Sequence, residues 1–235
     1  MVTSSAAALR ADLRAATGDV LGVGAGMLVL GTSFGLLVVN AGLAWWWAPV
    51  FSAVVYAGSL EFLLVGLSVV GTPLVAVAVT ALLVNARHVV YGLSFPLHRI
   101  RSRAGRAYAV FALIDEAYAL TATRPAESLT GRRIVATQVL LQLCWVSGGL
   151  AGALAGATLA LDVPALDFVF VALFVVLAVD AVRAAREATP PLLAAASAVV
   201  AHAVAPQQML LVATVLVVAL LLLRHAVRWA GERRA

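Results

Sequence analysis

The sequence predicts an all-α protein, a polytopic membrane helix bundle with about six full spans and two re-entrant or broken segments. Of the residues, 63% are hydrophobic and 11% are charged, against about 45–50% and about 25% in soluble domains. The apolar residues also gather into runs near the length of about 20 that a membrane crossing needs. This composition disfavours a soluble enzyme, a disordered chain and a nucleic-acid-binding domain. We attribute the net charge of +5 to membrane topology and not to a nucleic-acid partner.

The runs predict where the spans lie. In chain order they cover residues 20–39, 43–70, 73–95, 107–122, 134–160, 164–182, 192–204 and 209–229. A polar lead-in, residues 1–19, precedes the first run. We expect that run to be a retained span and not a cleaved signal peptide, because it is long enough to span and more spans follow. The predicted organisation is a single transmembrane domain over 20–230, with a cytoplasmic lead-in and a short cytoplasmic tail at 231–235.

Arginine placement orients the bundle. The loop after the third run holds Arg99, Arg101, Arg103 and Arg106 and no acid, and arginines recur at 124–133, at 183–186 and near the C-terminus. The loops at 40–43, 71–72, 161–163 and 205–208 contain none. Arginine-rich loops stay on the cytoplasmic side. Both termini are therefore expected in the cytoplasm of a cell-membrane protein.

Eight full crossings cannot satisfy this assignment. The run at 43–70 lies between two arginine-free loops, and the run at 107–122 lies between two arginine-bearing loops. Each would enter and leave by one face, which predicts one re-entrant or broken segment from each side. The alternative is eight spans with some positive loops outside. Interrupted segments in membranes line cavities or lie buried in protein, and pairs of them point to a transporter's binding site.

Of the ionisable residues inside apolar runs, five are the main functional candidates. A charge near the bilayer centre costs about 2.5–3.5 kcal/mol and therefore needs internal partners. Arg87 lies roughly nine residues, or about 13 Å, from the cytoplasmic end of its run, too deep for ordinary snorkelling. The five are Glu61, Arg87, His88, Asp115 and Glu116. Helical spacing puts Asn85, His88 and Tyr91 on one face, and Tyr108, Phe111, Asp115 and Tyr118 on another.

Glycine and glutamine spacing predicts helix packing. Gly31 and Gly35 form one small-residue pair, and Gly148, Gly152 and Gly156 form a longer strip. Such faces allow close approach of helices. We expect packing within the chain over a dimer seam, although a partner subunit would fit as well. Gln138 and Gln142, four residues apart, are expected to hydrogen-bond another helix.

No catalytic, cofactor or metal motif is present in the sequence. It contains no Gly-x-x-x-x-Gly-Lys phosphate loop, no His-Glu-x-x-His and no Gly-x-Ser-x-Gly. The single cysteine, Cys144, excludes a thiolate-rich metal site. ATP-driven work would need another chain.

Four motifs together resemble the AzlC family of branched-chain amino acid permeases. They are Gly31-x-x-Phe34-Gly35, Ala57-Gly58-Ser59-x-Glu61-Phe62, Asn85-Ala86-Arg87-His88-Val89-Val90-Tyr91 and Asp115-Glu116-x-Tyr118. The resemblance implies a transporter, and not an enzyme, that exports small neutral, branched-chain-like amino acids. It also implies a small four-span AzlD-type membrane partner. The chain departs from the family at Glu61, a position more often occupied by glutamine, where an acid would add a protonatable group or alter substrate preference.

A zwitterionic substrate requires a carboxylate site, an ammonium site and an apolar pocket. Backbone N–H groups at Gly58 and Ser59, with Arg87, would take the carboxylate. Glu61 or Asp115 would take the ammonium group. The expected substrate-binding set is Phe34, Gly58, Ser59, Glu61, Phe62, Asn85, Arg87 and Tyr91, and the expected proton-coupling set is Glu61, His88, Asp115 and Glu116. A channel-like subunit is the alternative, and an intramembrane enzyme with His88 and an acid as base is less favoured.

Overall fold

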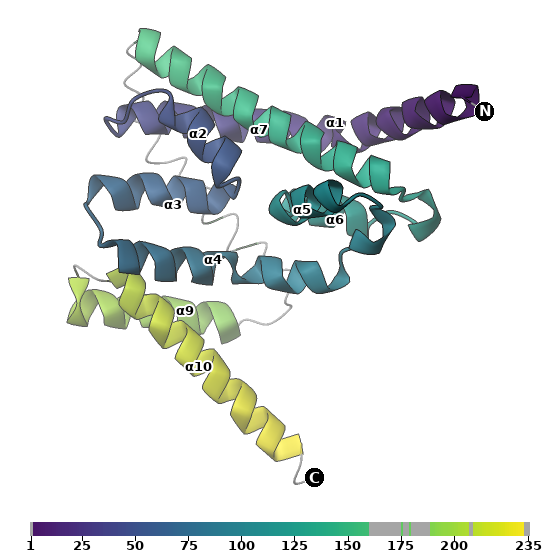
Figure 1. Ribbon diagram of the computed structural model, residues 1–235. Coiled ribbons are helices and arrows are strands. Elements are labelled where there is room, and N and C mark those ends of the chain that lie inside the picture. Colours follow the sequence, from purple (N-terminus) through teal and green to yellow (C-terminus); the bar gives the residue numbers. More distant parts are fainter. Residues whose placement is uncertain (1, 160–174, 176–178, 180–188, 207–208, 233–235) are drawn as a thin grey trace. The chain divides into compact units, whose positions relative to one another are not determined.

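The computed structural model describes residues 2–159, 175, 179, 189–206 and 209–232. Within these residues the chain is all-helical, as predicted (Figure 1). The nine described α-helices are α1 (Val2–Asn40), α2 (Trp47–Val54), α3 (Gly58–Val69), α4 (Leu74–Ser94), α5 (Arg103–Phe111), α6 (Asp115–Ala122), α7 (Gly131–Leu159), α9 (Thr189–Val204) and α10 (Met209–Glu232). The span expected at 164–182 lies outside the described residues.

Three of the described helices are long and apolar enough to cross a membrane. They are the part of α1 over Ala6–Asn40, the whole of α4 and the whole of α7. Shorter apolar stretches lie at Gly58–Val69, Pro191–Val204 and Val215–Arg224. α1 runs unbroken past residue 19. The polar lead-in is therefore the first part of one long helix and not a separate segment.

Both expected interruptions are present. The first lies at residues 55–57, where Tyr56 adopts a positive φ of 43° and Ala57 leaves the helical region before α3 starts at Gly58. The second lies at residues 112–114, where Ile114 is extended and α6 starts at Asp115. This second break corrects the expectation that Tyr108, Phe111, Asp115 and Tyr118 share one helical face, because the helix ends at Phe111.

The two flanks of the α5–α6 segment meet. Nη1 of Arg99, ahead of α5, donates to the carbonyl oxygens of Ala126 at 2.7 Å and Leu129 at 2.9 Å, both beyond α6. Ile100 and Leu129 also share a buried apolar cluster. The chain therefore leaves this segment at the end where it entered. In Figure 1 the chain likewise turns back between α2 and α3.

α1 and α7 pack closely through their glycines, as expected for packing within the chain. The two helices lie against each other and cross in Figure 1. A Cβ added at Gly35 would overlap the carbonyl oxygen of Gly149, and one added at Gly152 would overlap that of Thr32. Gly31 faces the carbonyl of Trp145 in the same way. Only glycine permits this approach of the two backbones.

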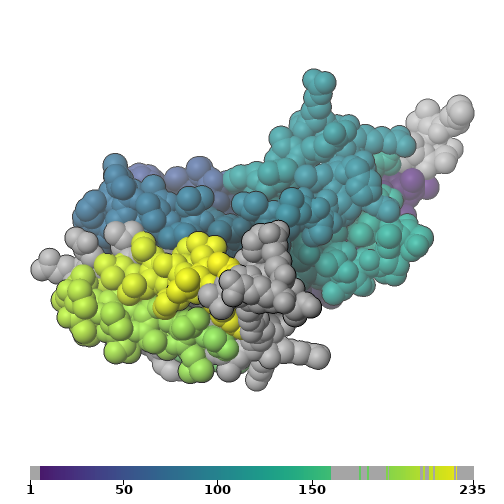
Figure 2. All heavy atoms as spheres, turned by 90° about the horizontal axis from the view of Figure 1, so that it is seen from below, coloured from purple at the N-terminus to yellow at the C-terminus, as the bar shows by residue number. Residues whose placement is uncertain are grey.

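The chain forms two compact units. The first is drawn from Met1–Thr72 and Val84–Leu166, and the second from Pro73–Leu83 and Asp167–Ala235. In the second unit α9 and α10 pack side by side, and their atoms lie in contact in Figure 2. All the site residues described below belong to the first unit.

Candidate functional site

Arg87 connects the starts of the two half-helices that follow the interruptions. Its Nη2 lies 2.9 Å from Oδ2 of Asp115, the first residue of α6. The same nitrogen donates to Oγ of Ser59, the second residue of α3, at 2.9 Å. The sequence predicted each of these three residues separately, and the structure brings them together.

Several polar atoms around this ion pair remain unused. Oδ1 of Asp115, Nε of Arg87 and Oδ1 of Asn85 are buried and have no hydrogen-bond partner among the described residues. The two charged side chains are still 36% and 34% exposed. Buried polar atoms are normally paired, so unpaired ones beside an accessible charge pair indicate capacity for a polar ligand. The half-helix starts add positive dipole ends.

Glu61 occupies a different, fully buried position. Its Oε2 accepts from Ser52 Oγ at 3.0 Å, and its Oε1 accepts from the Ala57 backbone N–H at 3.0 Å. Nε1 of Trp145 reaches both oxygens, at 3.1 and 3.0 Å. Glu61 therefore ties the α2–α3 interruption to α7 through neutral donors. Within the described residues, no ion pair joins Glu61 to a basic group.

Phe34 and Phe62 form an aromatic cluster with Trp145 behind the first interruption. The Phe34 ring centroid lies 5.4 Å from that of Phe62 and 6.1 Å from that of Trp145. Both phenylalanines are fully buried. A Cβ added at Gly58 would lie 3.2 Å from Cη2 of Trp145, so this cluster sets the position of the α3 start.

His88 and Tyr91 stand beside Arg87 on α4. The His88 ring is edge-on to Tyr91 at 5.7 Å, and Tyr91 stacks on Tyr118 of α6 at 4.4 Å. The Tyr118 hydroxyl shares a 2.9 Å hydrogen bond with Ser94. Glu116, next to Asp115, is partly buried. The aromatic stack thus joins the C-terminal part of α4 to α6.

Both glutamines of α7 bond another helix, as expected. Nε2 of Gln138 donates to the carbonyls of Ala109 and Ala112, at 2.9 and 3.0 Å. These carbonyls lie where α5 ends and its own hydrogen-bond ladder stops. Oε1 of Gln142 accepts from the Tyr108 hydroxyl at 2.8 Å. The glutamines therefore support the second interruption, much as Glu61 supports the first.

Sequence reasoning missed Trp145 and Ser52 as the partners of Glu61. Trp145 precedes Gly148 by three residues and Gly152 by seven, so it shares the small-residue face of α7. The sequence signal for Trp145 as a partner was therefore its N–H donor on the small-residue face of α7. Ser52 offered none, because its role depends on how the chain turns at residues 55–57.

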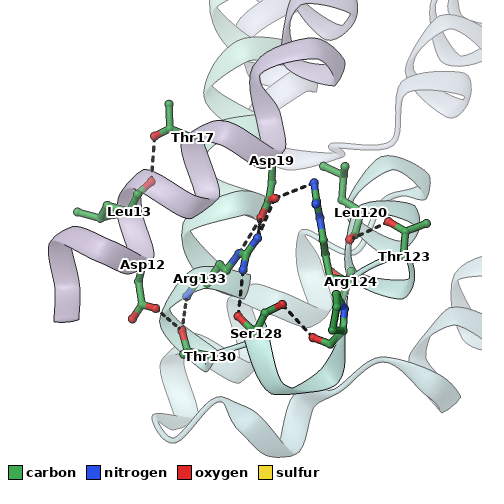
Figure 3. Close-up of polar contacts among 12 residues, drawn as sticks. Asp12, Leu13, Thr17, Asp19, Leu120, Thr123, Arg124, Ser128, Thr130 and Arg133 are labelled. Atoms are coloured by element: carbon green, nitrogen blue, oxygen red, sulfur yellow. Dashed lines mark hydrogen bonds and ion pairs between the residues drawn. The ribbon is translucent and has the colours of Figure 1, made fainter.

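A second ionic cluster, also missed, lies around Asp19 (Figure 3). Arg133 of α7 holds both carboxylate oxygens, with Nε 2.7 Å from Oδ2 and Nη2 2.8 Å from Oδ1. Arg124 Nη2 lies 2.8 Å from Oδ1. Asp12, seven residues earlier on α1, accepts from Thr130 Oγ1 at 2.9 Å. The sequence had assigned these residues to the lead-in and to topology alone.

The starts of two interrupted helical segments both contact Arg87 of α4, one through an ion pair and the other through a hydrogen bond, and the long apolar helices are those of a membrane protein. The chain belongs to the AzlC family, because the family profile described as AzlC protein matches residues 22–159. That range contains both interruptions, Arg87 and the Glu61–Trp145 contact. It confirms the resemblance drawn from the four motifs.

Of three relatives, two are membrane proteins by name and the third carries the family name. An uncharacterized membrane protein of Helicobacter pylori is 34% identical over 155 residues, covering 65% of this chain and 68% of the relative. The branched-chain amino acid transport protein AzlC of Bacillus subtilis is 31% identical over 174 residues, covering 72% and 68%. The inner membrane protein YgaZ of Escherichia coli is 27% identical over 142 residues, covering 57% of each chain. No solved structure matches the chain.

Proposed function

We propose that this chain is a secondary transporter that moves small neutral, branched-chain-like amino acids across the cytoplasmic membrane. The family resemblance implies outward transport, and the titratable residues inside the apolar runs suggest coupling to protons. Family membership and the printed name of the Bacillus subtilis relative support the substrate class. The observation that carries the proposal is the bridge from Ser59 through Arg87 to Asp115.

The proposed substrate enters the Arg87–Asp115 ion pair. Its carboxylate replaces Asp115 on Arg87 and accepts from backbone N–H groups at Gly58 and Ser59. Its ammonium group binds Asp115, whose Oδ1 has no hydrogen-bond partner among the described residues. A zwitterion exchanges one charge pair for another, so no net charge is buried, whereas an isolated charge would be costly. Asn85 and Tyr91 complete the polar wall.

We propose that Phe34 and Phe62 face the apolar end of this site. They pack with Trp145, whose ring lies against Gly58. An apolar substrate side chain directed past Gly58 would meet this cluster. Branched aliphatic groups gain about 0.8 kcal/mol per CH₂ buried, which favours them over glycine or alanine.

Proton coupling is assigned to Glu61, His88, Asp115 and Glu116. Only groups that change charge can couple flux to a proton gradient. Asp115 and His88 lie next to the proposed substrate position, so protonation there competes with ammonium binding. Glu61 is held by neutral donors only, and a proton would remove its buried charge.

For the topology we propose six full spans and two re-entrant segments, α2–α3 from outside and α5–α6 from the cytoplasm. Residues 20–230 would then form one transport domain with both termini cytoplasmic. The meeting of the α5–α6 flanks at Arg99 supports this. Cysteines introduced at Ser102 and Ser128, in a Cys144→Ala background, should both be labelled from the cytoplasmic side. Labelling of one from outside would overturn the proposal.

The functional test is exchange of labelled leucine and valine in proteoliposomes. Arg87→Gln and Asp115→Asn should each lower transport about tenfold or more, because each removes a charged hydrogen-bond partner of the proposed substrate, a contribution of roughly 1.5–3 kcal/mol. Ser59→Ala should cost less. The matched controls are Arg103→Gln and Ser68→Ala, since Arg103 is exposed and Ser68 only bonds the Leu64 carbonyl of its own helix.

The same vesicles separate the alternatives. A channel would give conductance without saturable exchange, and an intramembrane enzyme would consume its substrate. Wild-type transport in Arg87→Gln would overturn the proposed site. The assay is run with and without a co-expressed AzlD-type partner, because the family resemblance implies that small four-span protein as a partner besides the substrate. No nucleic-acid partner and no cofactor are proposed.

A further inference from the structure

A groove of about 1150 Å³ lies at the starts of α5 and α7, apart from the Arg87 site. Residues near the N-terminal end of α1 form one wall, the loop around His98 and Arg101 forms another, and the first turns of α7 form a third. The groove therefore sits at the ends of two helices that are long enough to span a membrane.

The charge of the groove lining is positive. It contains three arginines, Arg99, Arg101 and Arg132, and one acid, Asp12, for a formal charge of 3 − 1 = +2. Arg99 is held by two backbone carbonyls, and Asp12 accepts from Thr130. Arg101 and Arg132 are exposed and have no ion pair among the described residues. These two guanidinium groups are free for an anion.

Two helix starts reinforce that charge. Ser102 and Gly105 at the beginning of α5, and Thr130 and Gly131 at the beginning of α7, belong to the lining. Helix N-termini carry partial positive charge and backbone N–H donors that suit phosphate oxygens. The charge and the dipoles therefore favour the same kind of ligand group.

Apart from His98, the remaining lining is apolar. Leu13, Val135 and Val139 contribute, and Leu13 and Val139 are well exposed. A free inorganic phosphate would gain nothing from contact with such an apolar wall. An amphiphile would bind the basic lining with its phosphate head and the apolar lining with its hydrocarbon tails. Basic pockets at helix ends on the cytoplasmic side bind anionic lipid headgroups, and the arginine pattern assigns this end to the cytoplasm.

We propose that this groove binds an anionic phospholipid of the surrounding membrane, with the phosphate at Arg101 and Arg132 and the acyl chains along Leu13 and Val139. This inference uses residues outside the proposed substrate site. Its failure would leave the transport proposal intact, and failure of the transport proposal would leave it intact.

The test measures lipid binding to the purified full-length chain in detergent by native mass spectrometry. Phosphatidylglycerol is compared with phosphatidylcholine of the same acyl chains, and inorganic phosphate is a third arm. The chain should retain phosphatidylglycerol in preference to phosphatidylcholine. The double variant Arg101→Gln/Arg132→Gln should weaken that binding about 25-fold, or about fivefold per arginine. Binding of phosphatidylcholine should not change.

Arg103→Gln is the matched control, because Arg103 is exposed at the first position of α5, two residues after Arg101, but is not part of the lining. It should bind phosphatidylglycerol as the wild type does. Leu13→Asn should weaken both lipids, which tests the apolar wall. Equal binding of the two lipids, unchanged affinity in the double variant, or displacement of lipid by millimolar phosphate would each overturn the proposal.

Discussion

The indole N–H of Trp145 lies 3.1 Å from Oε1 and 3.0 Å from Oε2 of Glu61. This contact joins the middle of α7 to the first turn of α3. Glu61 also accepts from Ser52 of α2 and from the backbone of Ala57. One buried carboxylate therefore holds three helices and the interruption between two of them.

Trp145→Phe should destabilise the protein by about 1.5–3 kcal/mol, because a hydrogen bond to a charged group is lost while the ring volume is largely kept. Thermal unfolding in detergent should show a fall of roughly 3–12 °C. Trp45→Phe is the control, since Trp45 is 44% exposed, and it should unfold near the wild-type temperature. Equal shifts in the two variants would argue against the Glu61 contact.

Glu61→Gln should fold, because the amide oxygen can accept from Ala57 and Trp145 while the amide nitrogen donates to the Ser52 hydroxyl. Glu61→Leu leaves these donors without an acceptor, at about 1–3 kcal/mol each. Size-exclusion chromatography should show a monodisperse glutamine variant and an aggregated leucine variant. If the glutamine variant keeps wild-type, pH-dependent transport, Glu61 is not a proton carrier.

Gly35→Ala should destabilise by about 1–3 kcal/mol, since the added Cβ would overlap the carbonyl of Gly149 and force α1 from α7. Gly26→Ala on the same helix has nothing within 4 Å of its Cβ position. That variant should gain about 0.5–1 kcal/mol from reduced chain entropy. Thermal unfolding of the pair should move in opposite directions, and a loss of stability in both would contradict the packing described.

Asp19→Asn should cost about 3 kcal/mol, because it leaves the buried Arg133 guanidinium without its bidentate acid. Arg124→Gln should cost under about 1 kcal/mol, since the Arg124 side chain is 40% exposed and Arg133 keeps its partner. The comparison is made by thermal unfolding at one salt concentration. Similar losses in the two variants would show that Arg124, and not Arg133, dominates the cluster.

Local features of the fold could be read from the sequence. The sequence predicted interrupted segments within 43–70 and 107–122 because polar residues fell inside apolar runs between loops of matching charge, and the breaks lie at 55–57 and 112–114. Glycine spacing, which is a property of each helix alone, predicted faces for close packing within the chain, and the structure shows that those of α1 and α7 meet. These features depend on neighbours within a few residues, and that is the range over which periodicity carries information.

Contacts between distant segments could not be read in this way. Glu61 was predicted near the substrate, but its partners are Ser52 and Trp145, and they depend on how α7 packs against the turn at Tyr56. Asp19 and Arg133 are 114 residues apart, so no spacing rule relates them. By contrast, Ser59, Arg87 and Asp115 were each predicted as candidates because polar groups inside apolar runs need internal partners, and the structure places Ser59 and Asp115 on Arg87.

The glycine contacts between α1 and α7 also fix the register of the two helices. At Gly31, Gly35, Gly148 and Gly152 one backbone rests on the other, so sliding by a single residue would drive a side chain into a main chain. Trp145 is on the same helix as two of these glycines, and its height is therefore set by them. Because Trp145 bonds Glu61, the α1–α7 pair also sets the position of Glu61. In the proposed transport cycle, we therefore expect a change in which side of the membrane reaches Arg87 to come from the short half-helices, while α1 and α7 keep their register.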